Sequence, residues 1–356
     1  MIEKTPQDDA DRIVSGAQRD DDESGDIPLR PQHFSDFIGQ EKEKGNLALF
    51  LEAAKKRGEA LDHILFTGPP GLGKTTLSRI LANELGVKMQ TSSGPVLERP
   101  RDLAGNLTSL EDRDILFIDE IHRLSHVVEE YLYPAMEDFV FDIMLGEGPS
   151  AQSVRLNLKH FTLIGATTRQ GMLTSPMLGR FGYVCHLGYY APQELKQIAL
   201  RSAGIMGIGC DEEAAAELGR RSRGTPRIVN RLLRRCRDVA EVKGKGRVTV
   251  DVVNTTLAML GVDADGLDEI DRKILLSIID HYGGGPVGIN TVAVVVGEEP
   301  DTIEEVYEPF LIQCGFLKRT PRGREVTSKV YKYFNLDAGA KKNSPPQPSL
   351  FPGENE

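Results

Sequence analysis

One glycine-rich segment carries the clearest chemical signal in the sequence. Residues 68–75 read GPPGLGKT and match the pattern GxxxxGK[ST], in which glycines let backbone N–H groups approach phosphates. Lys74 would reach the β- and γ-phosphates, and the Thr75 hydroxyl would bind Mg²⁺. Residues 63–67 (HILFT) are expected to form a short buried strand before the segment, and a helical pattern through Leu85 follows it, as such a loop requires. This context argues against the alternative of a chance glycine turn.

Two acidic residues follow a second buried strand. Residues 115–118 (ILFI) are wholly apolar, and Asp119 and Glu120 come next. Such a strand is typical of a parallel sheet covered on both faces, and ligands of these sheets lie at the carboxyl ends of the strands. The sequence therefore predicts that Asp119 binds Mg²⁺ and that Glu120 orients or deprotonates the attacking water. Taken alone, the two acids could simply end a buried strand.

Hydroxyl and guanidinium groups complete the candidate catalytic set. A third apolar strand, residues 161–166, ends in Thr167 and Thr168, where a hydroxyl could sense the γ-phosphate or hold the water. Arg180 follows in a loop. A lone loop arginine is usually a solvated charge. In an oligomeric ATPase, however, an arginine at this place could be an arginine finger, which enters the nucleotide site of the neighbouring subunit. The expected catalytic residues are Lys74, Asp119, Glu120, Thr168 and Arg180.

These groups require an α/β scaffold, and a chain of 356 residues exceeds one ordinary core. After the strands, helical patterns that include the GTPR segment at residues 224–227 predict a small helical lid. Three more helical patterns and a basic hairpin at residues 316–327 predict a winged-helix domain. We expect a disordered acidic tail at 1–26, a large ATPase domain at 27–190, the lid at 191–262, the winged helix at 263–336 and a disordered tail at 337–356.

Two hairpins are candidate contact surfaces. A β-hairpin is predicted within residues 139–158, and its tip residues Ile143, Met144 and Leu145 either pack on the body or form an exposed apolar patch for a partner. The basic stretch at residues 318–332 holds six bases and one acid. DNA contact would therefore run through it, mainly to phosphates and without sequence specificity. A merely solvated basic hairpin remains the alternative.

The overall composition narrows the classes of protein. The formal net charge of −10 argues against a protein that coats nucleic acid, although a local basic patch can still bind nucleic acid. No apolar run approaches the roughly 18 residues that span a bilayer, and no apolar signal segment begins the chain, so we expect a cytoplasmic protein without a membrane partner. The four cysteines are scattered and lack metal-ligand spacing, which predicts reduced thiols.

Several longer sequence motifs resemble those of a known protein family. GPPGLGKTT, LFIDEIHRL, FTLIGATTR, RGTPRI and LIQCGFLKRTPRGR together resemble the RuvB family, the bacterial Holliday-junction branch-migration motors of the AAA+ ATPases, from about Leu29 to Phe334. The resemblance implies an AAA+ P-loop parallel-sheet domain, a helical lid and a C-terminal winged helix. It implies an ATP-dependent DNA translocase or helicase of recombination and repair, with ATP and Mg²⁺ as cofactors. A homohexamer around duplex DNA, four-way junctions as substrate, and RuvA and RuvC as partners are also implied.

The same resemblance implies roles for individual residues at the nucleotide. Arg180 would be the finger donated to the neighbouring subunit. The family usually has Arg-Asp before this arginine, whereas Leu178 and Gly179 stand there in this chain. The residues expected to surround the nucleotide are Leu29, Arg30, Gly71, Lys74, Thr75, Thr76, Glu137, Asp138, Phe139, Arg180, Tyr190 and Arg227.

Contacts with macromolecules are implied as well. Arg319 and Arg324 would touch DNA, and the residues expected to contact RuvA are Ile143, Met144 and Leu145, which favours the exposed-patch interpretation. Near the C-terminus, residues 347–351 (QPSLF) are similar to the QxxLF peptides that bind the bacterial sliding clamp. The clamp is thus a candidate partner, through Gln347, Leu350 and Phe351.

Two other functions remain open from the residues alone. An ATP-dependent protein remodeller would share the nucleotide site, but no extra substrate domain or aromatic pore loop is evident. A DNA-binding switch that does not hydrolyse ATP would not need Lys74, Asp119 and Glu120 together. Stimulation of the ATPase by DNA rather than by protein would separate the first of these from a DNA motor, and steady-state turnover would exclude the second.

Overall fold

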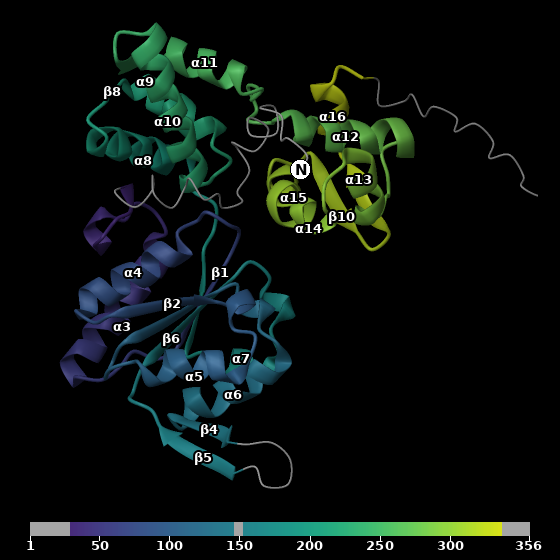
Figure 1. The fold of residues 1–356 in the computed structure, drawn as a ribbon. Coiled ribbons are helices and arrows are strands. Elements are labelled where there is room, and N and C mark those ends of the chain that lie inside the picture. Colours follow the sequence, from purple (N-terminus) through teal and green to yellow (C-terminus); the bar gives the residue numbers. More distant parts are fainter. Residues whose placement is uncertain (1–28, 146–151, 337–356) are drawn as a thin grey trace, which may run out of the picture. The chain divides into compact units, whose positions relative to one another are not determined.

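The computed structural model describes residues 29–145 and 152–336, and it divides into two compact units (Figure 1). The first unit ends at Gly266 and the second begins at Leu267. The predicted tails at 1–26 and 337–356, with the QPSLF peptide, lie outside the described residues. Among the helices that are described, none is long and apolar enough to cross a membrane.

A five-stranded sheet forms the centre of the first unit. Its strand order is β2-β3-β6-β1-β7, and every neighbouring pair is parallel. The strands predicted at residues 63–67, 115–118 and 161–166 correspond to β1, β3 and β6, whereas β7 is a four-residue edge strand that is only partly buried and has no apolar run. The strands are β1 (Ile64–Thr67), β2 (Met89–Ser93), β3 (Ile115–Asp119), β6 (Thr162–Thr167) and β7 (Tyr183–His186).

Helices cover both faces of this sheet and enclose two apolar cores (Figure 1). Because successive side chains of a strand point to opposite faces, Phe66 and Phe117 join the core beneath α3 and α4, whereas Leu65 and Leu116 join the core with α5 and α6. The helices are α3 (Glu41–Arg57), α4 (Lys74–Leu85), α5 (Pro100–Thr108), α6 (His126–Glu137) and α7 (Ser175–Gly179). Short 3₁₀ turns occupy Phe34–Asp36, Gly94–Val96, Ile121–Arg123 and Gln170–Met172.

An antiparallel hairpin of β4 (Val140–Leu145) and β5 (Gln152–Asn157) lies between β3 and β6 in the chain, as the sequence predicted. Ile143 pairs with Val154 and is half-buried. The side chains of Met144 and Leu145 fall outside the described part of the chain, so the choice between a packed and an exposed tip stays a prediction.

Four helices and a two-stranded parallel pair follow the sheet within the first unit. Their apolar residues, among them Leu195, Leu218 and Leu232, continue the core that covers α4. Pro226 lies in the first turn of α10, and the Thr225 hydroxyl donates to the Arg223 carbonyl rather than capping the helix. The elements are α8 (Pro192–Ile205), β8 (Gly209–Cys210), α9 (Glu212–Arg221), α10 (Pro226–Lys243), β9 (Arg247–Val248) and α11 (Val250–Met259).

The second unit has the three helices and the hairpin of a winged helix. The third predicted helix is interrupted by a π-helical turn at Ile303–Tyr307. The hairpin is shorter than the predicted basic stretch, because Thr327 caps a further helix that carries Lys329 and Lys332. The elements are α12 (Glu269–Tyr282), α13 (Ile289–Val296), α14 (Pro300–Thr302), α15 (Glu308–Gln313), β10 (Leu317–Thr320), β11 (Gly323–Val326) and α16 (Ser328–Tyr333).

Candidate nucleotide site

The loop between β1 and α4 has a backbone that only glycine adopts easily. Gly68, Gly71 and Gly73 have φ angles of +136°, +78° and +105°. A methyl group at Gly71 would also lie 2.7 Å from Cγ2 of Thr225, which belongs to the lid. Because α4 begins at Lys74, the positive end of a helix of 12 residues adjoins the loop. These features together fit the binding of a phosphate chain.

Lys74 is held inside this loop. Its side chain is buried, and its Nζ donates hydrogen bonds to the carbonyl oxygens of Gly68, at 2.6 Å, and Pro69, at 2.9 Å. Thr75 and Thr76 follow in the first turn of α4 and are half-buried. A lysine ammonium and a threonine hydroxyl therefore start the helix at the point where phosphates and their metal ion would bind.

Asp119 lies at the carboxyl end of β3, and several groups act on its carboxyl. Burial raises the pKa of Asp119, while the Glu120 N–H and the charges of Lys74 and Arg227 oppose that rise. The Asp119 carboxylate is thus close enough to interact electrostatically with both the loop and the lid. Because burial disfavours an uncompensated carboxylate, this is a position where a cation would bind favourably.

Glu120 adopts a backbone conformation that is uncommon for a residue with a side chain. Its φ angle is +47°, and its carboxylate accepts a hydrogen bond of 2.9 Å from Arg123. Strained backbone of this kind costs of order 1–3 kcal/mol and often occurs at functional sites. The side chain is half-buried beside Asp119, which agrees with the position expected for the residue that orients water.

The end of β6 carries a hydroxyl without a hydrogen-bond partner. Thr167 bonds with Nδ1 of His122 and accepts from the Arg169 N–H, both at 2.9 Å. In contrast, Oγ1 of Thr168 is buried and has no partner among the described residues. Since buried polar groups are normally satisfied, an unpartnered hydroxyl at the carboxyl end of β6 fits a water molecule or a phosphate oxygen.

The lid and the segment before α3 approach the loop from another side. The buried Tyr190 hydroxyl donates to the Leu72 carbonyl at 3.1 Å, and a methyl group at Gly71 would lie 3.1 Å from Cβ of Arg227. Leu29 is buried and its carbonyl accepts from Arg201 of α8 at 2.8 Å. The structure therefore places Tyr190 and Arg227 at the loop, and connects Leu29 to the lid; Arg30 is half-buried next to it.

The remaining predicted residues lie at the amino ends of the strands, away from the phosphate loop. Glu137 is the last residue of α6 and is followed by Asp138 and Phe139, and Arg180 is the C-cap of α7, before β7. β1 and β7 are parallel neighbours, with Ile64 opposite Tyr183, so Arg180 lies at the amino ends of the strands whereas Lys74 follows their carboxyl ends. Within one copy of the chain, Arg180 and Lys74 therefore lie at opposite ends of the strands.

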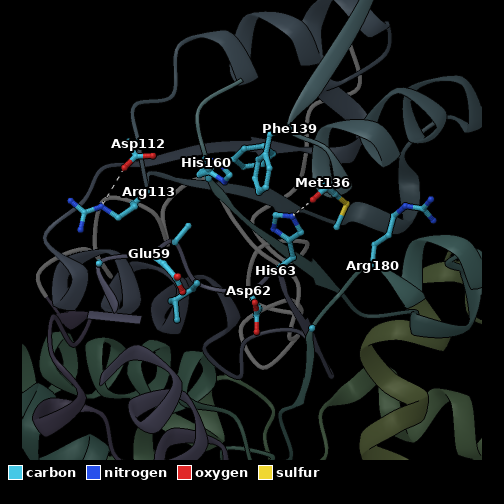
Figure 2. Close-up of a pocket in the computed structure, with 14 residues that line it drawn as sticks. Glu59, Asp62, His63, Asp112, Arg113, Met136, Phe139, His160 and Arg180 are labelled. Carbon is cyan, nitrogen blue, oxygen red and sulfur yellow. Dashed lines mark hydrogen bonds and ion pairs between the residues drawn. The ribbon is translucent and has the colours of Figure 1, made fainter. Parts of the chain in front are cut away.

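A pocket of about 540 Å³ lies at the amino ends of these strands (Figure 2). His63 lies in it, donating through Nε2 to the Met136 carbonyl at 3.0 Å and accepting from the Leu163 N–H at 2.8 Å, which assigns the tautomer. Burial lowers the pKa of His63. Phe139 and Arg180 line the same pocket, and Figure 2 shows the Arg180 guanidinium directed away from His63. Sequence reasoning missed His63, because a histidine before a buried strand carries no motif.

The two expected DNA contacts of the wing have different surroundings. The Arg319 side chain is 59% exposed and pairs with Glu304 at 2.8 Å. Arg324 is only 8% exposed, and its guanidinium donates to both carboxylate oxygens of Glu308, with an Nη2 to Oε2 distance of 2.9 Å. The structure thus presents Arg319 to solvent but not Arg324, because Arg324 is engaged by a buried acid from α15.

Family models match nearly all of the described chain. The model described as the Holliday junction DNA helicase RuvB P-loop domain matches residues 29–187, the RuvB AAA lid domain matches 190–263, and the RuvB C-terminal winged helix domain matches 264–335.

Solved structures of one bacterial protein are also similar. The Thermotoga maritima RuvB Holliday junction branch migration motor is 51% identical, with a TM-score of 0.81 over 87% of this chain and 99% of that chain. Two of its mutants are equally identical: one has a TM-score of 0.81 over 86% of this chain, the other 0.80 over 87%, and each is covered over 99% of its own length.

Proposed function

The chain belongs to the RuvB family of P-loop AAA+ ATPases, and we propose on that basis that it is an ATP-driven motor that moves four-way DNA junctions. Membership confirms the resemblance drawn from the sequence, together with the expected fold class and ATP hydrolase activity. One observation carries the proposal: a single chain contains both a complete phosphate loop and a winged helix that follows it. In that loop, Lys74 is close enough to Asp119 to interact with it electrostatically.

The residues at the loop fit ATP with Mg²⁺. A bound metal would supply positive charge next to the phosphates and so stabilise the negative charge that develops in the transition state. We assign the metal to Thr75 and Asp119, the phosphates to Lys74, and the orientation of the attacking water to Glu120. Thr168 would then use its unpartnered hydroxyl toward the water or the γ-phosphate.

The positions of Arg180 and Lys74 at opposite ends of the strands support an oligomer. Arg180 lies at the amino ends of the strands and Lys74 beyond their carboxyl ends, so a nucleotide site that includes both residues needs a second copy of the chain. We propose a homohexamer in which Arg180, with Glu137, Asp138 and Phe139, completes the neighbour's site. A finger of this kind contributes about 10³- to 10⁵-fold to the rate in related phosphoryl-transfer enzymes.

The partners complete the proposal. Arg319 on the exposed face of the wing would bind DNA phosphates, and the tip of the β4–β5 hairpin would bind RuvA. Action alongside RuvC, a cytoplasmic location and docking of residues 347–351 on the sliding clamp are further proposals that rest on the sequence alone.

ATPase stimulation tests the nature of the substrate. Steady-state turnover is measured with duplex DNA, with an unfolded protein and with neither, and Lys74→Ala serves as the inactive control. A DNA motor predicts stimulation by duplex DNA only, lost in Lys74→Ala. Stimulation by unfolded protein without any response to DNA would overturn the proposal in favour of a protein remodeller.

A further inference from the structure

Three contacts hold the guanidinium of Arg180. Nη2 pairs with Oε2 of Glu137 at 3.1 Å, Nη1 donates to the Pro176 carbonyl at 2.7 Å, and Cζ lies 4.1 Å from the centroid of the Tyr133 aromatic ring. The Arg180 side chain is 19% exposed. Its head group is therefore already oriented before any neighbour binds, and α6 supplies two of the three contacts.

Tyr133 is itself fixed from the other side. Its hydroxyl donates to Glu129 at 2.6 Å and lies 2.9 Å from the Thr174 hydroxyl, which also bonds with Glu129. Glu129 is 8% exposed, and Thr174 caps the start of α7. Burial raises the pKa of Tyr133, which agrees with a neutral phenol that donates its proton.

Helical spacing places these groups in one row. Glu129, Tyr133 and Glu137 are four residues apart on α6, so they share one face of the helix. The first of them bonds with the residue that starts α7, and the last pairs with the arginine that ends it. This row therefore sets the position of α7 at both ends and the direction of the Arg180 side chain.

The residues beside Arg180 supply no such control. Leu178 is apolar, and Gly179 has no side chain; a methyl group there would meet no atom within 4 Å. The orienting charge and the aromatic surface both come from α6 instead. We propose that Tyr133 is a positioning residue for the arginine finger, its aromatic ring directing the Arg180 guanidinium toward the neighbouring subunit's nucleotide. The inference rests on the proposed function, because Arg180 meets phosphate only in an oligomer.

Two substitutions separate the aromatic ring from the hydroxyl. Tyr133→Leu removes the cation–π contact, and we expect kcat of the DNA-stimulated ATPase to fall roughly tenfold while KM and the binding of a fluorescent ATP analogue stay near their wild-type values. Tyr133→Phe keeps the ring and should retain most of the wild-type kcat. Thermal unfolding and light scattering of both variants report on folding and assembly.

Mixing experiments show whether the residue acts on its own subunit or on the neighbour. Lys74→Ala subunits cannot hydrolyse ATP but carry an intact finger. When they are added to Tyr133→Leu subunits, turnover per Tyr133→Leu subunit should rise. The reason is that some Tyr133→Leu phosphate loops then adjoin a Lys74→Ala subunit, whose Arg180 is still positioned by Tyr133. Lys74→Ala added to wild type is the matched control, which corrects for the dilution of active subunits.

The outcomes distinguish this inference from the proposed function. If Arg180→Ala hydrolyses ATP normally, the finger itself is refuted. If Arg180→Ala is inactive but Tyr133→Leu keeps the wild-type kcat, or loses nucleotide affinity in parallel with kcat, or is not rescued by Lys74→Ala subunits, Tyr133 does not position the finger.

Discussion

The sheet domain and the wing both offer cations to phosphates, but they hold them in different ways. Lys74 is 8% exposed and is fixed by two backbone carbonyls of a glycine loop. Arg319 is 59% exposed and is held by one carboxylate of Glu304. A buried, oriented charge acts strongly because it is shielded from water, whereas an exposed pair is worth at most about 1 kcal/mol. Position in the fold, rather than charge alone, should therefore decide the size of each mutational effect.

The largest effect should come from the oriented arginine of the sheet domain. Arg180→Ala should lower kcat of the hexamer by about 10³-fold or more while nucleotide binding remains, because the phosphate loop of each subunit is intact. Steady-state ATPase and equilibrium binding of a fluorescent ATP analogue measure the two quantities. Near-normal hydrolysis would show that the residue is an ordinary loop arginine.

A buried arginine in the wing should behave unlike its exposed neighbour. Arg324→Ala leaves the Glu308 carboxylate buried without its partner, and breaking such pairs costs about 3–5 kcal/mol of the free energy of unfolding. Urea unfolding followed by circular dichroism measures this cost, with Arg319→Ala as the matched control that should change stability little. Equal, small effects of the two substitutions would contradict the burial of Arg324.

A pH dependence of the free energy of unfolding, of intermediate size, should arise from His63 at the amino ends of the strands. Burial lowers the pKa of His63 below its ordinary value of 6.5. As pH falls below 6.5, the unfolded chain therefore gains a proton that the folded protein does not, and stability decreases by up to about 1.4 kcal/mol per pH unit until the folded pKa is reached. The stabilising contribution is complete above 6.5.

His63→Gln removes this titration. The free energy of unfolding of the variant, measured against wild type at neutral and at mildly acidic pH, should depend less on pH. An unchanged slope would mean that the other histidines account for the acid sensitivity.

The smallest effect should belong to the exposed cation. Arg319→Ala should weaken duplex DNA binding by about 1 kcal/mol, and the slope of log affinity against log salt should fall by about 1, because one phosphate contact is lost. Fluorescence anisotropy over a salt series gives both values. An unchanged slope would show that Arg319 remains with Glu304 in the complex.

The same contrast explains how far the sequence could predict the molecule. The phosphate loop and Asp119 lie within or directly after apolar strands, so local sequence determines both their structure and their position in the parallel sheet. The burial of Arg324 depends on Glu308, which is 16 residues away in the sequence and belongs to α15. A basic hairpin has the same composition whichever of its arginines points inward.

Two other features escaped prediction for a similar reason. Tyr133 contacts Arg180 only because α6 and α7 pack together, and no local sequence pattern indicates that contact. β7 is a short edge strand, partly exposed, and it lacks the apolar run that identified the central strands. Properties that depend on packing between distant elements are the ones that sequence periodicity does not contain.

Branch migration of a synthetic four-way junction tests the central claim most directly. A fluorescently labelled junction is incubated with the chain and ATP, with and without the cognate RuvA, and Lys74→Ala is the control. We predict separation of the junction into duplexes that requires ATP, Lys74 and the partner. ATP hydrolysis that is stimulated by DNA, yet leaves the junction unmoved in the presence of RuvA, would contradict the assignment of this chain as a branch-migration motor.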